Sequence, residues 1–141
     1  MMNFSIEQQR HSVSNNGPGT RRCWNATIDL FNQNLGFGYL TEEAVNRFFR
    51  DHEHAGLYAA VTDSGPLPCI GAVLIAILSR AEREAYGKTL GKAANGLLIK
   101  YRRVGFIKAL VVDSNRRRQG VGKALTLYAL QQFKRWDCEA I

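Results

Sequence analysis

Hydrophobic positions along the first third of the chain recur with the period of a helix. Between residues 20 and 34 apolar side chains return every three or four positions, which predicts an amphipathic helix that ends before Gly36 and Gly38. Thr41 is a favourable N-cap residue and is followed by two glutamates, so a second helix is expected to begin there and to stop by Gly56. Both helices are expected to bury aromatic side chains in the core, namely Trp24, Phe31, Phe48 and Phe49.

The pattern then changes to short apolar runs, which are typical of strands. The runs that predict strands are 4–9, 57–62, 69–78 and 104–112. A turn at 63–66 indicates that the second and third runs form an antiparallel hairpin. A polar, basic excursion follows over 79–103, with a short helix expected near Arg80 to Tyr86. A long amphipathic helix is predicted over 120–136, and 138–141 reads as the start of a further strand. Residues 12–20 read as a loop.

Length and composition limit the protein class. The 141 residues suit one domain, and a hydrophobic content of 45% is ordinary for a globular protein. The longest apolar run, 69–78, is too short to span a bilayer, and the N-terminus lacks an apolar signal core. The three cysteines, Cys23, Cys69 and Cys138, form no metal or disulfide pattern. We therefore expect a cytoplasmic protein with free thiols, no metal and no membrane partner.

Positive charge is concentrated in the second half of the chain. Residues 1–79 carry five Lys/Arg against seven Asp/Glu, whereas residues 80–141 carry fourteen against five. The net charges are therefore −2 and +9. Such an asymmetry indicates an anionic partner, and nucleic acid and a polyphosphate ligand are the two leading classes.

The most informative segment runs from Leu110 to Leu125, where a buried strand enters an arginine-rich turn that leads directly into a helix. Unpaired N–H groups at a helix start, together with the helix dipole, form an anion site suited to phosphate. Gly120 and Gly122 lack side chains, so the backbone can approach a bulky diphosphate closely. Full positive charges surround the turn at Arg116, Arg117, Arg118 and Lys123.

The segment lacks both the Walker A pattern and the complete dinucleotide-binding glycine pattern. It resembles motif A of the GCN5-related N-acetyltransferases (GNAT), in which Arg/Gln-x-x-Gly-x-Gly/Ala follows a strand ending in Leu-x-Val. Residues 110–112 correspond to the strand end and 117–122 to the loop. The expected order of elements also fits that family. The resemblance implies an α/β fold of the α+β type, with a mixed, mostly antiparallel central sheet flanked by helices, formed by residues 1–141 as a single domain.

The resemblance further implies acetyl-CoA as acyl donor and a primary amine as acceptor. Backbone amides from Arg118 to Lys123 would hold the pyrophosphate, and the strand end would pair with the pantetheine arm. An amide near Val111 or Val112 would stabilise the oxyanion. The residues assigned to the acyl-CoA site are Leu110, Val111, Val112, Arg117, Arg118, Gln119, Gly120, Val121, Gly122 and Lys123.

Two expectations concern what the sequence does not supply. Members of the family usually continue past this helix, so the chain is expected to lack the C-terminal strands, and a homodimer or another partner is expected to cover the open sheet edge. The general base is unassigned, with Glu42, Glu43, Glu53 and Glu82 as acids able to reach the cleft.

The leading hypothesis is an acyl-CoA-dependent N-acetyltransferase that works by direct attack of the amine on the thioester. The alternative is a truncated, non-catalytic module that binds CoA or nucleic acid. Lys100 to Arg103 mix basic and aromatic residues, as nucleic-acid binders do, but nucleic acid is the less favoured partner.

Overall fold

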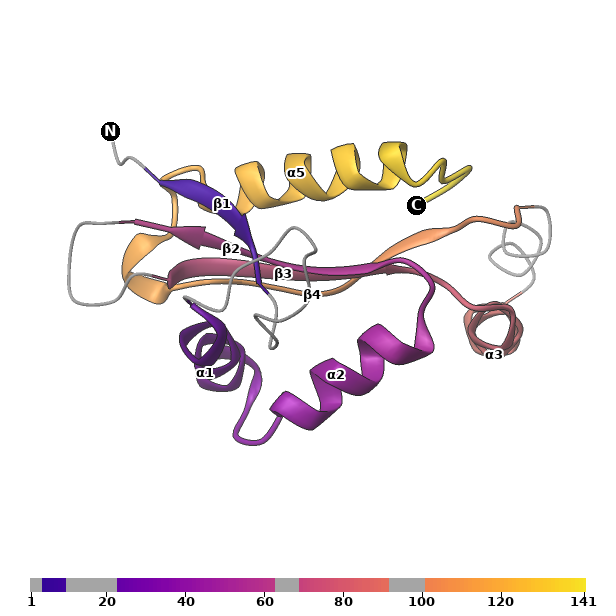
Figure 1. Ribbon diagram of the computed structural model, residues 1–141, viewed down its shortest axis with the longest axis horizontal. Coiled ribbons are helices and arrows are strands. Elements are labelled where there is room, and N and C mark those ends of the chain that lie inside the picture. The colour runs from indigo at the N-terminus through magenta and orange to yellow at the C-terminus, as the bar shows by residue number, and fades with distance from the viewer. Residues whose placement is uncertain (1–3, 10–22, 63–68, 92–100) are drawn as a thin grey trace.

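A single antiparallel sheet forms the centre of the computed structural model, which describes residues 4–9, 23–62, 69–91 and 101–141 (Figure 1). Its strands, in the order β1-β2-β3-β4, are β1 (Ser5–Gln8), β2 (Ala55–Val61), β3 (Cys69–Ile77) and β4 (Gly105–Val112). The helices are α1 (Trp24–Leu35), α2 (Glu42–Asp51), α3 (Arg80–Leu90) and α5 (Val121–Arg135), with a short 3-10 helix η1 (Ser114–Arg116). The predicted fold class, a mostly antiparallel sheet flanked by helices, is confirmed.

Helices cover both faces of the sheet. Figure 1 shows α5 on one face, α1 and α2 on the other, and α3 beyond one end of the strands. Side chains of β2 and β3 alternate between the faces, so Leu57 and Leu74 join the core under α1 and α2, whereas Tyr58 and Val73 join the core under α5. Since both faces are covered, β2 and β3 are apolar along nearly their whole length, which explains why they appear in the sequence as continuous apolar runs.

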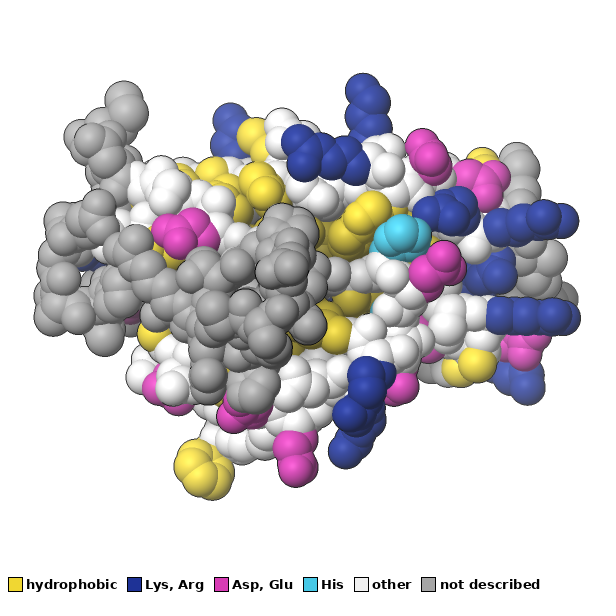
Figure 2. Space-filling view, viewed as in Figure 1, with side chains coloured by type: hydrophobic (Ala, Val, Ile, Leu, Met, Phe, Trp, Pro, Cys, Tyr) yellow, Lys and Arg dark blue, Asp and Glu magenta, His cyan; other side chains and the backbone are white. Residues whose placement is uncertain are grey.

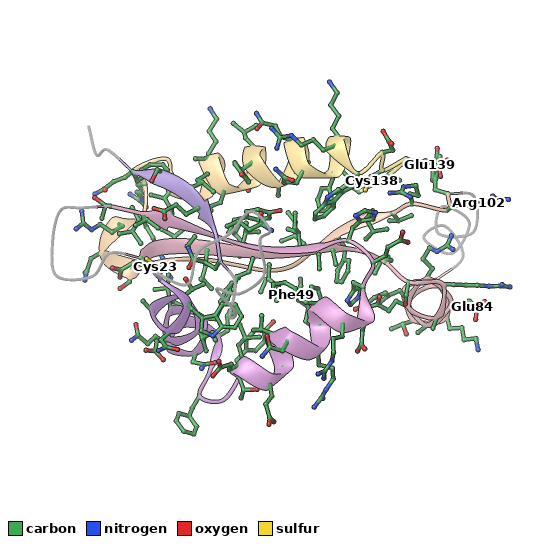
Figure 3. All side chains as sticks on the ribbon, in the orientation of Figure 1. Cys23, Phe49, Glu84, Arg102, Cys138 and Glu139 are labelled. Carbon is green, nitrogen blue, oxygen red and sulfur yellow. The ribbon has the colours of Figure 1, made fainter. Side chains whose placement is uncertain are left out.

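The aromatic residues predicted to be core lie under α1 and α2. Trp24 and Phe31 are fully buried, and Phe48 and Phe49 are partly buried against the same cluster. Figure 3 shows Phe49 between α2 and the sheet. The prediction is therefore confirmed, with the two α2 aromatics at the margin of the core rather than at its centre.

Two glycines let α5 approach the sheet closely. A Cβ atom at Gly71 would lie 2.8 Å from Val121 Cγ1, and one at Gly105 would lie 2.5 Å from the Phe133 ring. Gly71 lies on β3 near the start of α5, and Gly105 begins β4 beneath the end of the helix. A side chain at either position would collide with the helix, so these glycines fix how both ends of α5 pack on the strands.

The buried face of α5 is narrower than the sequence suggests. Val121, Leu125, Ala129 and Phe133, spaced four residues apart, are all buried against the sheet. Leu127 and Leu130 are also apolar and lie in the same predicted amphipathic helix, but they are 50% and 39% exposed. Leu127 is two positions from both Leu125 and Ala129, a rotation of about 200°, so it lies on the side of the helix away from the sheet. Leu130 follows Ala129 by about 100° and lies on the flank of the helix.

The helix after β3 is longer than predicted, since α3 extends to Leu90 rather than ending near Tyr86. Gly87 has low helix propensity, yet it lies inside the helix. The start is strongly stabilised, because the Ser79 hydroxyl accepts the Glu82 N–H while the Glu82 carboxylate accepts the Ser79 N–H, forming a capping box. The predicted N-cap of α2 is confirmed, since the Thr41 hydroxyl accepts the Ala44 N–H at 3.1 Å.

The C-terminal residues form less regular structure than predicted. Residues 138–141 form an isolated parallel bridge, Val104 with Ala140, in place of the start of a strand. The Gly105 N–H donates to the Ala140 carbonyl at 2.8 Å, which holds this segment beside the start of β4. The predicted loop at 12–20 and turn at 63–66 lie outside the described residues.

The described residues contain no helix long and apolar enough to cross a membrane. Nor do they contain a group of three or more His, Cys, Asp or Glu side chains placed to bind a metal ion.

Candidate functional site

The junction between β4 and α5 is fixed by main-chain hydrogen bonds. The Asp113 N–H donates to the Ile70 carbonyl of β3 at 2.9 Å, and the Asp113 carbonyl accepts the Arg116 N–H at 2.8 Å. The Asp113 carboxylate also accepts the Asn115 N–H at 3.3 Å, which opens η1. Arg118 and Gly120 then adopt positive φ angles of 64° and 82°, which reverse the chain into α5. The arginine-rich segment is therefore a defined turn at the strand end.

The start of α5 presents main-chain donors. The first intrahelical bond runs from the Ala124 N–H to the Gly120 carbonyl at 3.0 Å. The amides of Val121, Gly122 and Lys123 precede this bond and have no carbonyl within the helix to accept them. Gly120, the N-cap residue, has no side chain to accept an amide, and the first turn holds no acid. This N-terminus therefore combines unsatisfied donors, the positive end of the helix dipole and the charge of Lys123.

Gly122 has no role in packing. A Cβ atom there would meet only Val112 Cγ2, at 3.5 Å, which is an ordinary van der Waals contact. Its backbone does not adopt a positive φ, so an alanine would fit the helix and favour it. The fold itself therefore does not require glycine at this position, in contrast to Gly71 and Gly105.

The ten residues predicted for the site differ in which atoms they can offer. Val111 and Val121 are buried in opposite faces of the core, so only their backbones are available. Val112 packs partly against the α5 core, and Gly122 has no side chain to offer. The side chains of Arg117, Arg118, Gln119 and Lys123 are exposed around the turn, with Gly120 exposed between them, and Leu110 is 37% exposed. Sequence order and main-chain bonds bring all ten together at one end of β4.

One edge of β4 carries no ladder in the described part of the chain. β3 pairs with the other edge from Gly105 to Val112. Opposite Ile75 and Leu74 stand Ile107 and Ala109, so Lys108 is an extra residue in β4 and forms a bulge. The bulge at Lys108 increases the local twist of β4 four residues before the strand ends at Val112. Between the bulge and Val112, the edge of β4 that faces away from β3 has main-chain groups with which an extended ligand can pair.

A side-chain contact links the turn to α1. Arg117 donates from Nη2 to the Asn34 Oδ1 atom at 3.3 Å, next to the last residue of α1. The loop that follows α1 exposes Phe37 completely. The end of α1 therefore lies beside the arginine-rich turn, which sequence distance alone could not indicate.

The candidate general bases lie apart from the turn. Glu42 and Glu43 occupy the first turn of α2, and the Glu53 side chain is 88% exposed. Glu82 is engaged by Ser79 and by His52, whose Nε2 lies 2.6 Å from the carboxylate. Burial by itself would raise the pKa of Glu82, but the hydrogen bonds from Ser79 and His52 outweigh it and hold the pKa below its ordinary value. Glu82 is therefore a poor proton acceptor, and no general base is assigned.

Cys69 and Cys138 offer no activated thiolate at this site. Cys69 lies in β3 within the core, where burial raises the pKa of its thiol to about 11, against smaller opposing effects of hydrogen bonds to Thr27 and Gly71. Burial also raises the pKa of Cys138, with Arg103 opposing it. Such thiols are weak nucleophiles at neutral pH.

A cleft of about 320 Å³ lies at the other end of β4, which sequence reasoning missed. Its walls come from the end of α2, the end of β3, the start of α3 and the residues before β4. The residues that line it are Asp51, His52, Glu53, His54, Ile77, Leu78, Ser79, Arg80, Arg83, Arg102 and Arg103. Figure 2 shows basic and acidic side chains gathered at the α3 end, and Figure 3 shows Arg102 and Glu139 there. No local motif joins these four segments, so only the fold reveals the cleft.

Comparisons of the chain with family models and with solved structures both identify acetyltransferases. A family model described as "Acetyltransferase (GNAT) family" matches residues 24–141. No curated protein matches the chain. Among solved structures, an aminoglycoside acetyltransferase, meta-AAC0020, from an uncultured soil metagenomic sample superposes with a TM-score of 0.61 and 16% identity, covering 97% of this chain and 74% of that one.

Two further structures share the fold. Glucosamine-6-phosphate N-acetyltransferase from Arabidopsis thaliana has a TM-score of 0.61 and 17% identity, covering 98% of this chain and 79% of its own. A chain of the NatC complex bound to Gag peptide and CoA has a TM-score of 0.61 and 18% identity, covering 97% of this chain and 70% of its own. Since the family model spans most of the sequence and these folds agree with it, the chain belongs to the GNAT acetyltransferase family, whose members are acyl-CoA-dependent N-acetyltransferases.

Proposed function

We propose that the chain binds acetyl-CoA at the β4–η1–α5 junction and transfers the acetyl group to a primary amine. The observation that carries the proposal is the start of α5. Its first-turn amides have no side-chain cap, and Gly122 is a glycine that packing does not require. Family membership supplies the reaction class, and the junction supplies a place for the phosphates.

The pyrophosphate fits the first turn of α5. Main-chain amides from Arg118 to Lys123 would donate to its oxygens, and the absent side chain of Gly122 would let the phosphates approach the helix. The exposed guanidinium groups of Arg117 and Arg118 would add charge-assisted contacts. This assignment uses the backbones of Val121 and Gly122 and the side chains of the arginines.

The acyl arm fits the open edge of β4. From the turn, residues Leu110 to Val112 present main-chain groups along which the pantetheine amides would pair as an added strand. The amine nitrogen would attack the thioester carbonyl carbon, so the N–C bond forms while the C–S bond breaks. An amide of Val111 or Val112 would stabilise the negative oxygen, the thiolate would leave and take up a proton, and the amine proton would pass to water.

Binding and turnover are tested separately. Saturating CoA is expected to raise the melting temperature and give calorimetric heat, whereas adenosine without phosphates gives much less of either. Turnover is then measured as free thiol released from acetyl-CoA in the presence of a panel of amines. Absence of any CoA binding would refute the proposal. CoA binding without thiol release from any amine would favour the non-catalytic binding module.

A further inference from the structure

The cleft at the α3 end of the molecule carries more positive than negative charge on its walls. Four arginines line it, namely Arg80, Arg83, Arg102 and Arg103. Two carboxylates, those of Asp51 and Glu53, also line it, so the arginines outnumber the acids by two. The arginines come from the start of α3 and from the residues before β4, whereas the acids come from the α2 side. This excess of positive charge favours an anion in the cleft.

Main-chain hydrogen bonds fix the base of the cleft. The Ile77 N–H donates to the His54 carbonyl at 3.0 Å, and the Leu78 N–H donates to the Val104 carbonyl at 2.8 Å. These bonds join the end of β3 to the residues that precede β2 and β4. The His54 ring also stacks on the Trp136 ring at the end of α5, with a centroid distance of 5.5 Å. Segments far apart in the sequence are therefore held in one arrangement around the cleft.

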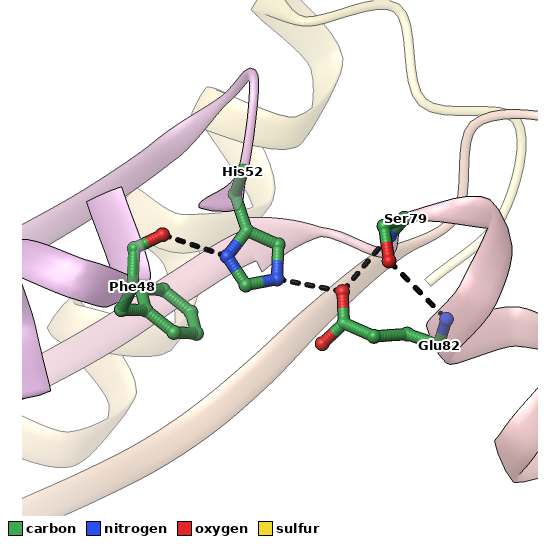
Figure 4. A network of polar contacts seen from close by, with 4 residues as sticks. All are labelled: Phe48, His52, Ser79 and Glu82. Carbon is green, nitrogen blue, oxygen red and sulfur yellow. Dashed lines mark hydrogen bonds and ion pairs between the residues drawn. The ribbon is translucent and has the colours of Figure 1, made fainter. Parts of the chain in front are cut away.

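Side-chain contacts hold the α3 wall against α2 (Figure 4). His52 Nδ1 lies 2.7 Å from the Phe48 carbonyl oxygen, and Nε2 lies 2.6 Å from Glu82 Oε1. The same Glu82 oxygen accepts the Ser79 N–H at 2.9 Å. The Glu82 carboxylate is thus engaged within the wall, while Ser79 and the two arginines of α3 face the cleft as lining residues.

Main-chain carbonyl groups orient two of the four arginines. Arg83 donates from Nη1 to the Tyr101 carbonyl at 2.6 Å. Arg103 donates to the Trp136 carbonyl from both Nε and Nη2, the former at 2.9 Å. A carbonyl oxygen bears no formal charge, so these bonds position the guanidinium groups without cancelling their charge. Each guanidinium has five N–H donors, of which these bonds use only one or two.

We propose that this cleft is an anion-binding site, which holds a carboxylate or phosphate group of a small molecule between α3 and the residues before β4. Guanidinium groups from the two segments would donate charge-assisted hydrogen bonds to its oxygens. The volume of about 320 Å³ suits a small ligand. The site lies at the opposite end of β4 from the α5 junction, so the proposal is independent of acyl-CoA binding.

Binding is tested by NMR on the nitrogen-labelled protein, with citrate and, separately, inorganic phosphate as probes. The backbone amides of Ser79, Arg80 and Arg103 are expected to shift saturably as either anion is added. The amides of the first α5 turn report separately on anions at the proposed acyl-CoA site, so the two sites are distinguished in one titration. If neither anion shifts the cleft amides saturably, the proposal is wrong.

A double variant tests whether the arginines of the lining bind the anion. Arg80 has a side chain that is 87% exposed, and Arg102 is exposed, so Arg80→Gln with Arg102→Gln removes two charges without disturbing the core. Citrate binding at the cleft amides is expected to weaken about tenfold. Arg47→Gln with Arg50→Gln makes the same charge change at exposed α2 positions outside the lining and should have little effect. Equal affinity in the two double variants would overturn the proposal.

The anionic group can belong to the amine acceptor or to a separate small molecule, and turnover distinguishes the two sources. Thiol release from acetyl-CoA is compared for linear aminocarboxylates of increasing length and for their uncharged amide analogues. If the acceptor supplies the anion, the acid is the better substrate, and the Arg80/Arg102 double variant removes that preference. If the anion is a separate molecule, acid and amide react alike while citrate still binds at the cleft. The citrate titration needs no turnover, so failure of the proposed function would leave the cleft fully tested.

Discussion

The N-termini of α3 and α5 solve the same physical problem in opposite ways. Each leaves main-chain donors without helical acceptors. At α3 the Ser79 hydroxyl and the Glu82 carboxylate accept main-chain N–H groups of the helix start, and His52 Nε2 lies 2.6 Å from the same carboxylate. At α5 the N-cap is Gly120, no side chain caps the helix, and the first turn carries a lysine in place of an acid.

We infer from this difference that the start of α3 serves the fold and that the start of α5 is available to a ligand. A self-capped end stabilises the fold but has few donors to offer. An uncapped end costs the fold about 1 kcal/mol relative to a good cap, yet it keeps donors and positive charge for an anion. The predictions below test this assignment, beginning with the largest expected effect.

The first prediction concerns Gly122. Gly122→Val is expected to weaken CoA binding at least tenfold, about 1.4 kcal/mol, because the side chain would occupy the space next to the phosphates. The fold should survive, since only Val112 lies near the new side chain. Calorimetric titration with CoA measures the affinity, and Gly122→Ala provides a smaller step at the same site. Unchanged affinity in a folded Val variant would place the pyrophosphate elsewhere.

The second prediction compares two exposed arginines. Arg117→Ala is expected to weaken CoA binding several-fold, because Arg117 lies in the turn that leads to the uncapped end of α5. Arg102 lies at the other end of β4, so Arg102→Ala should leave CoA affinity unchanged. Arg102 is a cleaner control than Arg103, whose guanidinium group bonds to the Trp136 carbonyl.

Salt dependence provides an independent readout of the same comparison. CoA binding should fall only several-fold between about 50 and 200 mM salt, because few phosphates are bound and fixed N–H groups hold them. Binding to duplex DNA through many phosphates should fall by orders of magnitude over the same range. Salt-resistant, sequence-selective DNA binding in a protein indifferent to CoA would favour the nucleic-acid alternative.

The third prediction concerns a substitution that gives the first turn of α5 an acidic residue, as in α3. Lys123→Glu places an acid in the first turn, so the free energy of unfolding is expected to rise by about 0.3–1 kcal/mol through the helix dipole. CoA affinity should fall, since the same carboxylate repels phosphate. Chemical denaturation and calorimetry give the two quantities. If both moved in the same direction, the competition between stability and anion binding inferred here would be wrong.

The fourth prediction concerns acid stability at α3. The pKa of Glu82 is lowered in the folded state, so the unfolded chain binds more protons near the ordinary value of 4.5. The stabilisation by Glu82 is thus fully present above that value and is lost as the pH falls through the folded-state pKa. Glu82→Gln should remove this part of the acid dependence, measured by denaturation at a series of pH values. An acid limb identical to the parent's would contradict the prediction.

The sequence predicted the α5 end of the molecule better than the α3 end. The buried strand, the turn and the helix are contiguous, so local patterning is enough to place Gly120 and Gly122 at a helix start. The Ser79-x-x-Glu82 capping signature is also local and marks the start of α3, but it carries no information on where the helix ends.

Other features could not be obtained from local patterns. The bond between His52 and Glu82 joins two elements through the packing of both against the sheet. For that reason Glu82 is a candidate base in the sequence, whereas in the structure its carboxylate is engaged by Ser79 and His52. The exposure of Leu127 and Leu130 likewise depends on which face of α5 meets the strands, because their hydrophobicity alone is compatible with either face.

The connection between β3 and β4 also bears on how the chain folds. Neighbouring antiparallel strands can be joined by a two-residue turn, yet here residues 78–104 lie between them and include α3. Each doubling of such a loop adds about 0.6 kcal/mol to the entropic cost of closing it. We therefore expect the pairing of β4 with β3 to form later in folding than the pairing of β2 with β3. The strand that carries the proposed acyl-CoA edge is therefore expected to join the folding nucleus late, and the capping box of α3 shortens the effective search by ordering part of the loop first.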